Sequence, residues 1–60
     1  MIDLLSETAA AEALQLRPKT LCRWRFERRG PVYVKVGGSV RYCRTDLADF
    51  VARNRVIQDV

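Results

Sequence analysis

The stretch that decides the fold runs from Leu14 to Gly30 and reads LQLRPKTLCRWRFERRG. A first helix is expected to end near Leu14. Pro18 then opens a second helix, because its fixed φ suits the first helical position. Gly30 is expected to close this helix after about Arg29, and Pro31 prevents it from continuing. Two helices joined by so short a corner cross at a steep angle, which is the helix-turn-helix arrangement.

The residues before this stretch predict the first helix, from Glu7 to about Leu14. Ser6 is a good N-cap, and Glu7 lies in the first turn, where the helix dipole favours an acid. Apolar residues recur there at helical spacing and let a second helix approach closely. They are Ala9, Ala10, Ala13 and Leu14. Leu4 and Leu5 are expected to anchor a short apolar lead-in, residues 1–5, to the core.

The second helix is expected to have a core face and an exposed face. With side chains turning by about 100° per residue, Leu21 and Trp24 point inward, whereas Lys19 and Arg23 point outward. Leu16, in the corner between the helices, is expected to be buried and to hold their crossing angle.

Residues 31–44, PVYVKVGGSVRYCR, predict a β-hairpin, because β-branched and aromatic residues flank the pair Gly37-Gly38. A three-residue loop from Gly37 to Ser39 would gather the apolar residues on one face. They are Val34, Val36, Val40 and Tyr42. Lys35 and Arg41 would then share the other face. We expect this register, because a two-residue loop would mix Arg41 with the valines.

A third helix is predicted after the hairpin. Thr45 is its expected N-cap, and Asp46 lies in its first turn. Leu47, Phe50 and Val51 recur at the spacing of a core stripe, and the helix is expected to end near Asn54. Residues 1–55 are therefore expected to form one domain, followed by a short apolar tail at 56–60.

Positive charge is concentrated in the middle of this 60-residue chain, whose net charge is +4. Between Arg17 and Arg44 there are nine basic residues and one acid, Glu27, which gives +8. The flanks carry six acids against Arg53 and Arg55, which gives −4. A basic centre of this kind predicts a face that binds a polyanion, with double-stranded DNA as the first candidate.

The same composition argues against catalysis. A chain of this size has no room for an enclosed active-site cleft, and it contains no histidine and no pattern of an activated nucleophile. Cys22 and Cys43 form no CxxC pair, so neither a metal nor another cofactor is expected. Reduced cysteines, rather than a disulfide, suit a cytoplasmic, nucleoid-associated protein. The N-terminus, MIDLLSETAA, lacks the apolar run of a signal peptide or membrane span.

Charge and element order together predict an α+β fold of the small winged helix-turn-helix type: helix, turn, recognition helix, two-stranded β-hairpin wing and C-terminal helix. In such a domain the first turns of the recognition helix reach base edges, and the wing lies over the DNA backbone. The recognition helix and its start are expected to contact DNA through Arg17, Lys19, Thr20, Arg23 and Arg28. The wing is expected to do so through Lys35, Gly37, Gly38, Ser39 and Arg41. Phe26 is also exposed, and either packs on a neighbouring loop or subunit or lies along the DNA backbone.

The order of motifs resembles the MerR-like excisionase group of winged helix-turn-helix domains. The resemblance covers about residues 4–54 and is carried by LLSETAAAEALQL, TLCRWRFERRGPVYVKVGGSVRY and TDLADFVARN. In that group the corner usually reads L-G-V-S, whereas this chain has L-Q-L-R-P, so Arg17-Pro18 replaces the usual serine cap. We expect Arg17 to contact phosphate there instead.

The resemblance implies a phage excisionase, also called a recombination directionality factor. Such a protein binds and bends attachment-site DNA, associates with copies of itself along it, and directs a phage integrase toward excision. The stand-alone length favours this interpretation, because a MerR regulator would carry a dimerisation helix and an effector domain. The alternatives are a small AlpA-like or MerR-like transcriptional regulator with the same DNA face, and a protein-interaction module.

Overall fold

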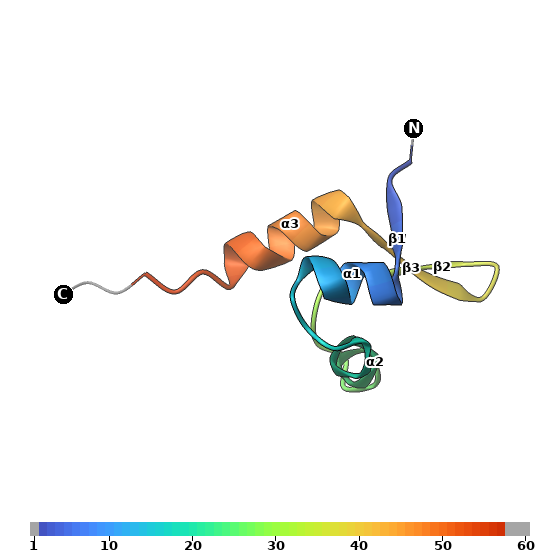
Figure 1. The fold of residues 1–60 in the computed structure, drawn as a ribbon, viewed down its shortest axis with the longest axis horizontal. Helices are drawn as coiled ribbons and strands as arrows, with labels where there is room; N and C mark the ends of the chain where they lie inside the picture. Colours follow the sequence, from blue (N-terminus) through green and yellow to red (C-terminus); the bar gives the residue numbers. More distant parts are fainter. Residues whose placement is uncertain (1, 58–60) are drawn as a thin grey trace.

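The computed structural model describes residues 2–57 and confirms the predicted α+β class, with three helices and three strands in this part of the chain. Figure 1 shows their arrangement. In chain order the elements are β1 (Leu4–Ser6), α1 (Glu7–Ala13), α2 (Pro18–Phe26), β2 (Val34–Val36), β3 (Ser39–Cys43) and α3 (Arg44–Arg53). The fold is consistent with a winged helix-turn-helix, in which α1 and α2 form the helix pair and β2 with β3 forms the wing.

The helix α1 is capped by a side chain at its start and by backbone hydrogen bonds at its end. The Ser6 hydroxyl oxygen accepts a hydrogen bond from the backbone N–H of Ala9 at 3.1 Å, which confirms Ser6 as the N-cap. At the other end Gln15 takes a positive φ of 58°, and the N–H of Leu16 donates to the carbonyl of Ala11 at 2.8 Å. This is a Schellman stop, which usually places glycine at the position of Gln15. It turns the chain sharply toward α2.

The helix α2 is shorter than predicted. Pro18 occupies its first turn as expected, but the helix ends at Phe26 rather than near Arg29. The prediction was wrong because a second Schellman stop intervenes: Arg28 has a φ of 58°, and the N–H of Arg29 donates to the carbonyl of Trp24 at 2.9 Å. Gly30 therefore lies beyond the helix and does not close it.

The sheet has one strand more than expected. The lead-in was predicted only to anchor the chain, yet Leu4 and Leu5 form β1 together with Ser6. This strand pairs antiparallel with β3 and gives the order β1-β3-β2. Leu5 lies opposite Tyr42, so both side chains face the helices. Three residues are too few to show the alternation that identifies a strand in a sequence. Met1, the first residue of the lead-in, lies outside the described residues.

The hairpin forms with a register different from the predicted one. Lys35 lies opposite Val40 and Val36 opposite Ser39, so the loop consists of Gly37 and Gly38 alone. Both glycines have positive φ, 57° and 92°, as a two-residue type I′ turn requires. Turn geometry therefore decided the register, and the expectation of a purely apolar face was wrong.

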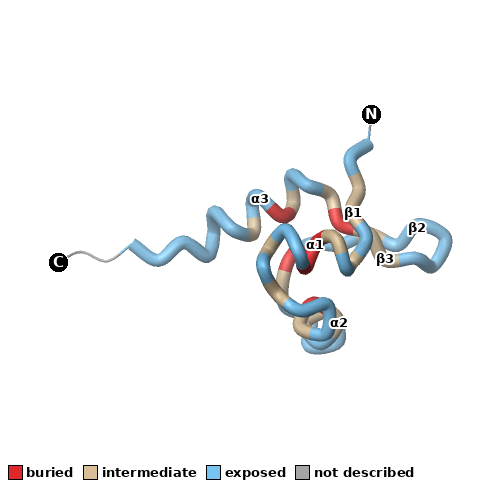
Figure 2. The backbone as a smooth tube through the Cα atoms, viewed as in Figure 1, coloured by how far each residue is buried: buried red, intermediate tan, exposed pale blue. Residues whose placement is uncertain are grey.

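The core is small and lies where α1 crosses α2 and the sheet, as the buried segments in Figure 2 show. Its buried apolar side chains are Ala10, Ala11, Leu21, Tyr42 and Leu47. Leu5, Leu14, Leu16, Trp24 and Val40 pack against them while remaining partly exposed. The predicted stripe of α1 was shifted: Ala11 is buried, whereas Ala13 is exposed.

The helix α3 begins earlier than predicted and packs only through its first turns. It starts at Arg44, directly after β3, so Cys43 rather than Thr45 occupies the N-cap. Leu47 is buried, but Val51 is 51% exposed and does not belong to the core. The predicted end is confirmed, because Asn54 is the C-cap and its side chain donates to the carbonyl of Phe50 at 2.8 Å. Of the predicted tail, residues 56–57 are exposed, and 58–60 lie outside the described residues.

Gly30 and Gly38 provide a matched test of the packing around Trp24. Their φ values are nearly equal, 91° and 92°, but a Cβ at Gly30 would lie 2.8 Å from the Trp24 ring, whereas one at Gly38 would meet nothing within 4 Å. We expect Gly30→Ala to lower the free energy of unfolding by about 1–3 kcal/mol more than Gly38→Ala, because only Gly30→Ala adds overpacking to backbone strain. Urea denaturation of both variants measures the difference, and equal losses would contradict the close approach to Trp24.

Candidate nucleic-acid interface

An ion pair between Glu7 and Arg25 fixes α2 against the rest of the domain. Arg25 Nε donates to Glu7 Oε2 at 2.7 Å, and Nη2 donates to Oε1 at 3.3 Å. The Tyr42 hydroxyl donates to Glu7 Oε2 at 3.3 Å. The Glu7 and Arg25 side chains are only 23% and 19% exposed. One carboxylate therefore joins the first turn of α1, the last turn of α2 and the central strand β3 through charge-assisted hydrogen bonds.

Protonation states follow from these contacts. The hydrogen bonds that Arg25 donates to the Glu7 carboxylate raise the pKa of Arg25 above its already high usual value, despite the opposing effect of burial. Burial, followed by repulsion from the Glu7 carboxylate, raises the pKa of Tyr42 to about 12. The phenol thus remains a hydrogen-bond donor across the physiological range. Sequence inspection missed this network, because Glu7 and Arg25 are far apart in the chain and each has an ordinary explanation as a helix-surface charge.

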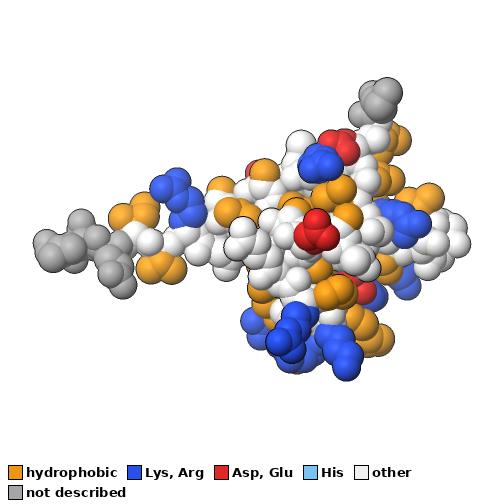
Figure 3. Space-filling view, in the orientation of Figure 1, with side chains coloured by type: hydrophobic (Ala, Val, Ile, Leu, Met, Phe, Trp, Pro, Cys, Tyr) orange, Lys and Arg blue, Asp and Glu red, His pale blue; other side chains and the backbone are white. Residues whose placement is uncertain are grey.

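The exposed face of α2 carries the predicted reader residues. Lys19 and Arg23 are exposed and Thr20 is half-buried at the edge of this face. Arg17 lies in the extended N-cap position, makes no side-chain capping bond and is exposed. Figure 3 shows Lys and Arg side chains gathered over α2 and a further group over the hairpin. The helix therefore presents Lys19 and Arg23 outward, while Leu21 and Trp24 hold it to the core.

The wing residues are only partly arranged as predicted. Lys35 and the tip residues Gly37, Gly38 and Ser39 are exposed. Arg41, however, is half-buried, and its Nη1 donates to the carbonyl of Val40 at 2.7 Å. Because the loop has two residues, Lys35 and Arg41 lie on opposite faces of the sheet, which corrects the expectation that they share one.

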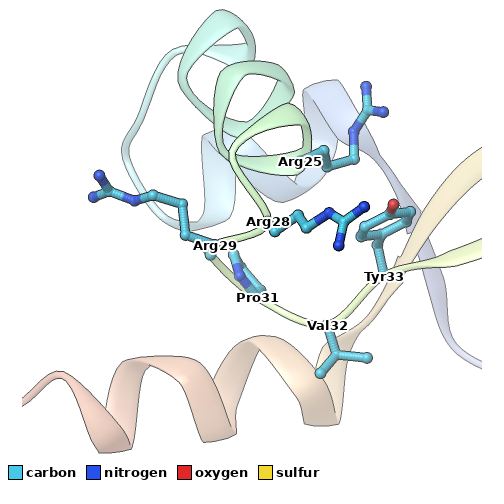
Figure 4. Close-up of a pocket in the computed structure, with 7 residues that line it drawn as sticks. Arg25, Arg28, Arg29, Pro31, Val32 and Tyr33 are labelled. Atoms are coloured by element: carbon cyan, nitrogen blue, oxygen red, sulfur yellow. The ribbon is translucent and has the colours of Figure 1, made fainter.

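A shallow open hollow of about 370 Å³ lies where the chain leaves α2. Its lining, drawn in Figure 4, is Arg25, Arg28, Arg29, Gly30, Pro31, Val32 and Tyr33. Figure 4 shows the Arg28 guanidinium beside the Tyr33 ring, whereas Arg29 points away. Arg29 lies over the Trp24 ring at 5.2 Å and pairs with Glu27 at 3.7 Å. Arg28 forms no ion pair with any other residue in the described range, so it is the free cation of this hollow.

Residues 2–57 offer neither a metal site nor a membrane-spanning helix. No group of three or more His, Cys, Asp or Glu side chains could hold a metal ion there. Cys22 and Cys43 are both free cysteines. None of the helices in this range has the length and apolar character needed to cross a membrane.

The Glu7 network can be tested against a surface pair of the same chemistry. Glu27 is an exposed carboxylate that lies 3.9 Å from Arg23 and 3.7 Å from Arg29. We expect Glu7→Gln to lower the free energy of unfolding by about 2 kcal/mol, because it leaves a partly buried guanidinium with a neutral partner. Glu27→Gln should change it by less than about 0.5 kcal/mol. Thermal or urea unfolding separates the two, and equal effects would show that Glu7 is only another surface charge.

The comparison with protein families identifies a family that covers most of the chain. Residues 4–55 match the model of a family described as a helix-turn-helix domain. Comparisons with curated proteins and with solved structures each found no match. The matched range begins at β1 and extends just past α3, so it includes all the elements described above. A helix-turn-helix is a DNA-binding unit, which makes DNA the partner that the match implies. The chain belongs to this helix-turn-helix domain family.

Proposed function

We propose that this protein is a phage excisionase, a sequence-specific architectural protein that binds and bends attachment-site DNA and directs a phage integrase toward excision. Membership of a helix-turn-helix family supports the DNA-binding part of this proposal. The order of sequence motifs, which resembles the MerR-like excisionase group, supports the finer assignment. In this role the protein performs no chemistry, and the integrase breaks and rejoins the strands.

The observation that carries the proposal is the presence of basic side chains on two separate projections of one small domain. The exposed face of α2 carries Lys19 and Arg23, and the hairpin carries Lys35 beside a slim glycine tip. A nine-residue helix fits the major groove, while a narrow hairpin can follow the neighbouring backbone or enter the minor groove. A protein that holds DNA at two such places gains contacts when the DNA curves toward it, and these contacts offset the cost of bending.

The individual residues divide between reading and positioning in this proposal. Lys19, Thr20 and Arg23 lie in the first two turns of the recognition helix and read base edges. The remaining residues position the duplex through phosphate and sugar contacts. They are Arg17, Arg28, Lys35, Gly37, Gly38, Ser39 and Arg41. Arg41 already uses one of its N–H donors on the Val40 carbonyl and is half-buried, so its contribution is expected to be smaller than that of Lys35.

An excision assay with a cognate integrase and its attachment sites tests this function. We expect excised product to require the protein. Arg23→Ala should weaken specific binding by about 1–3 kcal/mol, because it removes a base contact. The variant protein should therefore be needed at about 5- to 150-fold higher concentration for the same yield of excised product. Arg53→Ala, an exposed arginine in the last turn of α3, serves as the matched control and should behave like the wild type.

The outcomes separate the proposed roles. Excision that proceeds equally well without the protein would contradict the excisionase assignment. If the protein instead occupied a promoter and changed transcription, the regulator alternative would replace it. Equal excision by Arg23→Ala and Arg53→Ala would show that the exposed face of α2 does not contact DNA.

A further inference from the structure

We propose that Phe26 is an apolar DNA contact at the C-terminal end of the recognition helix. Its ring would pack against C–H surface of the duplex, which is supplied either by a thymine 5-methyl group in the major groove or by a deoxyribose of the adjoining backbone. The inference rests on the proposed DNA-binding function and deepens it, because it adds a large apolar side chain to an interface of basic, hydroxyl and glycine residues.

The exposure of Phe26 is the first observation. Phe26 is 81% exposed, although it belongs to a helix that buries Leu21 completely and half-buries Trp24. All residues of α2 are described, and Phe26 is the only large apolar side chain on the solvent side of this helix. The shape of the domain therefore provides no cover for this ring.

The position of Phe26 along the helix is the second observation. Lys19, Arg23 and Phe26 are spaced by four and three residues, so they form one stripe along a single helix face. At about 1.5 Å per residue, the stripe is roughly 10 Å long, which corresponds to about three base-pair steps of about 3.4 Å. A duplex that contacts Lys19 and Arg23 would therefore extend to Phe26.

The charges around Phe26 indicate which kind of molecule contacts its ring. Arg23 and Arg28 are exposed near it, and the one neighbouring carboxylate, Glu27, is shared between Arg23 and Arg29. An apolar protein surface that covered the ring would also remove these arginines from water without neutralising them. DNA instead presents apolar sugar and methyl groups beside phosphates, which matches an aromatic ring surrounded by arginines.

Arg25 connects this ring to the network described above. Its guanidinium carbon lies 6.0 Å from the centre of the Phe26 ring and 5.7 Å from that of Tyr33, while Glu7 holds its nitrogens. A cation fixed beside an aromatic ring favours particular orientations of that ring. Phe26 is thus presented outward from a helix end whose own position is fixed.

The test uses a duplex selected from random sequences by the wild-type protein, and an unrelated duplex of equal length. We expect Phe26→Ala to lower affinity for the selected duplex about tenfold, and Phe26→Leu to stay within about threefold of the wild type, because leucine keeps an apolar contact. Val51→Ala, which removes another exposed apolar side chain, should bind like the wild type. Thermal unfolding should show the same midpoint for Phe26→Ala and wild type, because the ring is exposed.

Replacing thymines of the selected duplex by deoxyuridine, which removes only the methyl group, distinguishes the two sources of apolar surface. A loss in the wild type that is absent in Phe26→Ala supports the thymine contact. The deoxyribose contact is supported by two results together. The wild type binds the thymine and deoxyuridine forms of the selected duplex with equal affinity, and Phe26→Ala lowers the affinity for both forms to the same extent. Phe26→Ala that binds both duplexes like the wild type overturns the inference alone. A wild type without salt-dependent DNA binding overturns the proposed function as well.

Discussion

The hydrogen-bonded ion pair between Glu7 and Arg25 is the interaction on which the arrangement of this domain depends. Among residues 2–57, five make up the buried apolar core, and two of them are alanines, so apolar burial alone gives little resistance to rotation of α2. The Glu7 carboxylate accepts hydrogen bonds from Arg25 of α2 and from Tyr42 of β3. Because hydrogen bonds are directional, this carboxylate sets the orientation of the recognition helix relative to the sheet that carries the wing.

The same interaction divides the arginines of α2 into two functions. Arg25 is used inside the domain, where its charge is matched by Glu7. Arg23, two residues earlier, points to solvent and has only a long contact of 3.9 Å with Glu27. The positive charge available to a polyanion is therefore smaller than the sequence total suggests, but it is placed on a helix face whose direction is fixed. Preorganisation of this kind reduces the entropy lost on binding.

Local signals predicted much of the fold, and long-range or backbone-specific features escaped prediction. Ser6, Pro18 and Asn54 mark helix ends through their own side chains or ring, so these ends were predictable. The stop at Arg28 was not, because it depends on a left-handed backbone at a residue that rarely adopts one. The hairpin register depended on the positive φ values of Gly37 and Gly38. This backbone geometry outweighed the preference for gathering all apolar residues on one face. The additional strand β1 and the Glu7 network could not be predicted, because both depend on contacts between distant segments. The proposed DNA-contacting residues remain predictions.

The central claim is that an oriented basic surface on α2 and the hairpin binds DNA, and the salt dependence of the association constant tests it most directly. Each phosphate neutralised by a lysine or arginine releases condensed counterions, so a plot of log K against log salt concentration should fall with a slope of about −0.9 per phosphate contacted. We expect a steep negative slope for the wild type, reduced by about one when the free cation Arg28 is replaced by alanine. A flat dependence in the wild type would contradict the account.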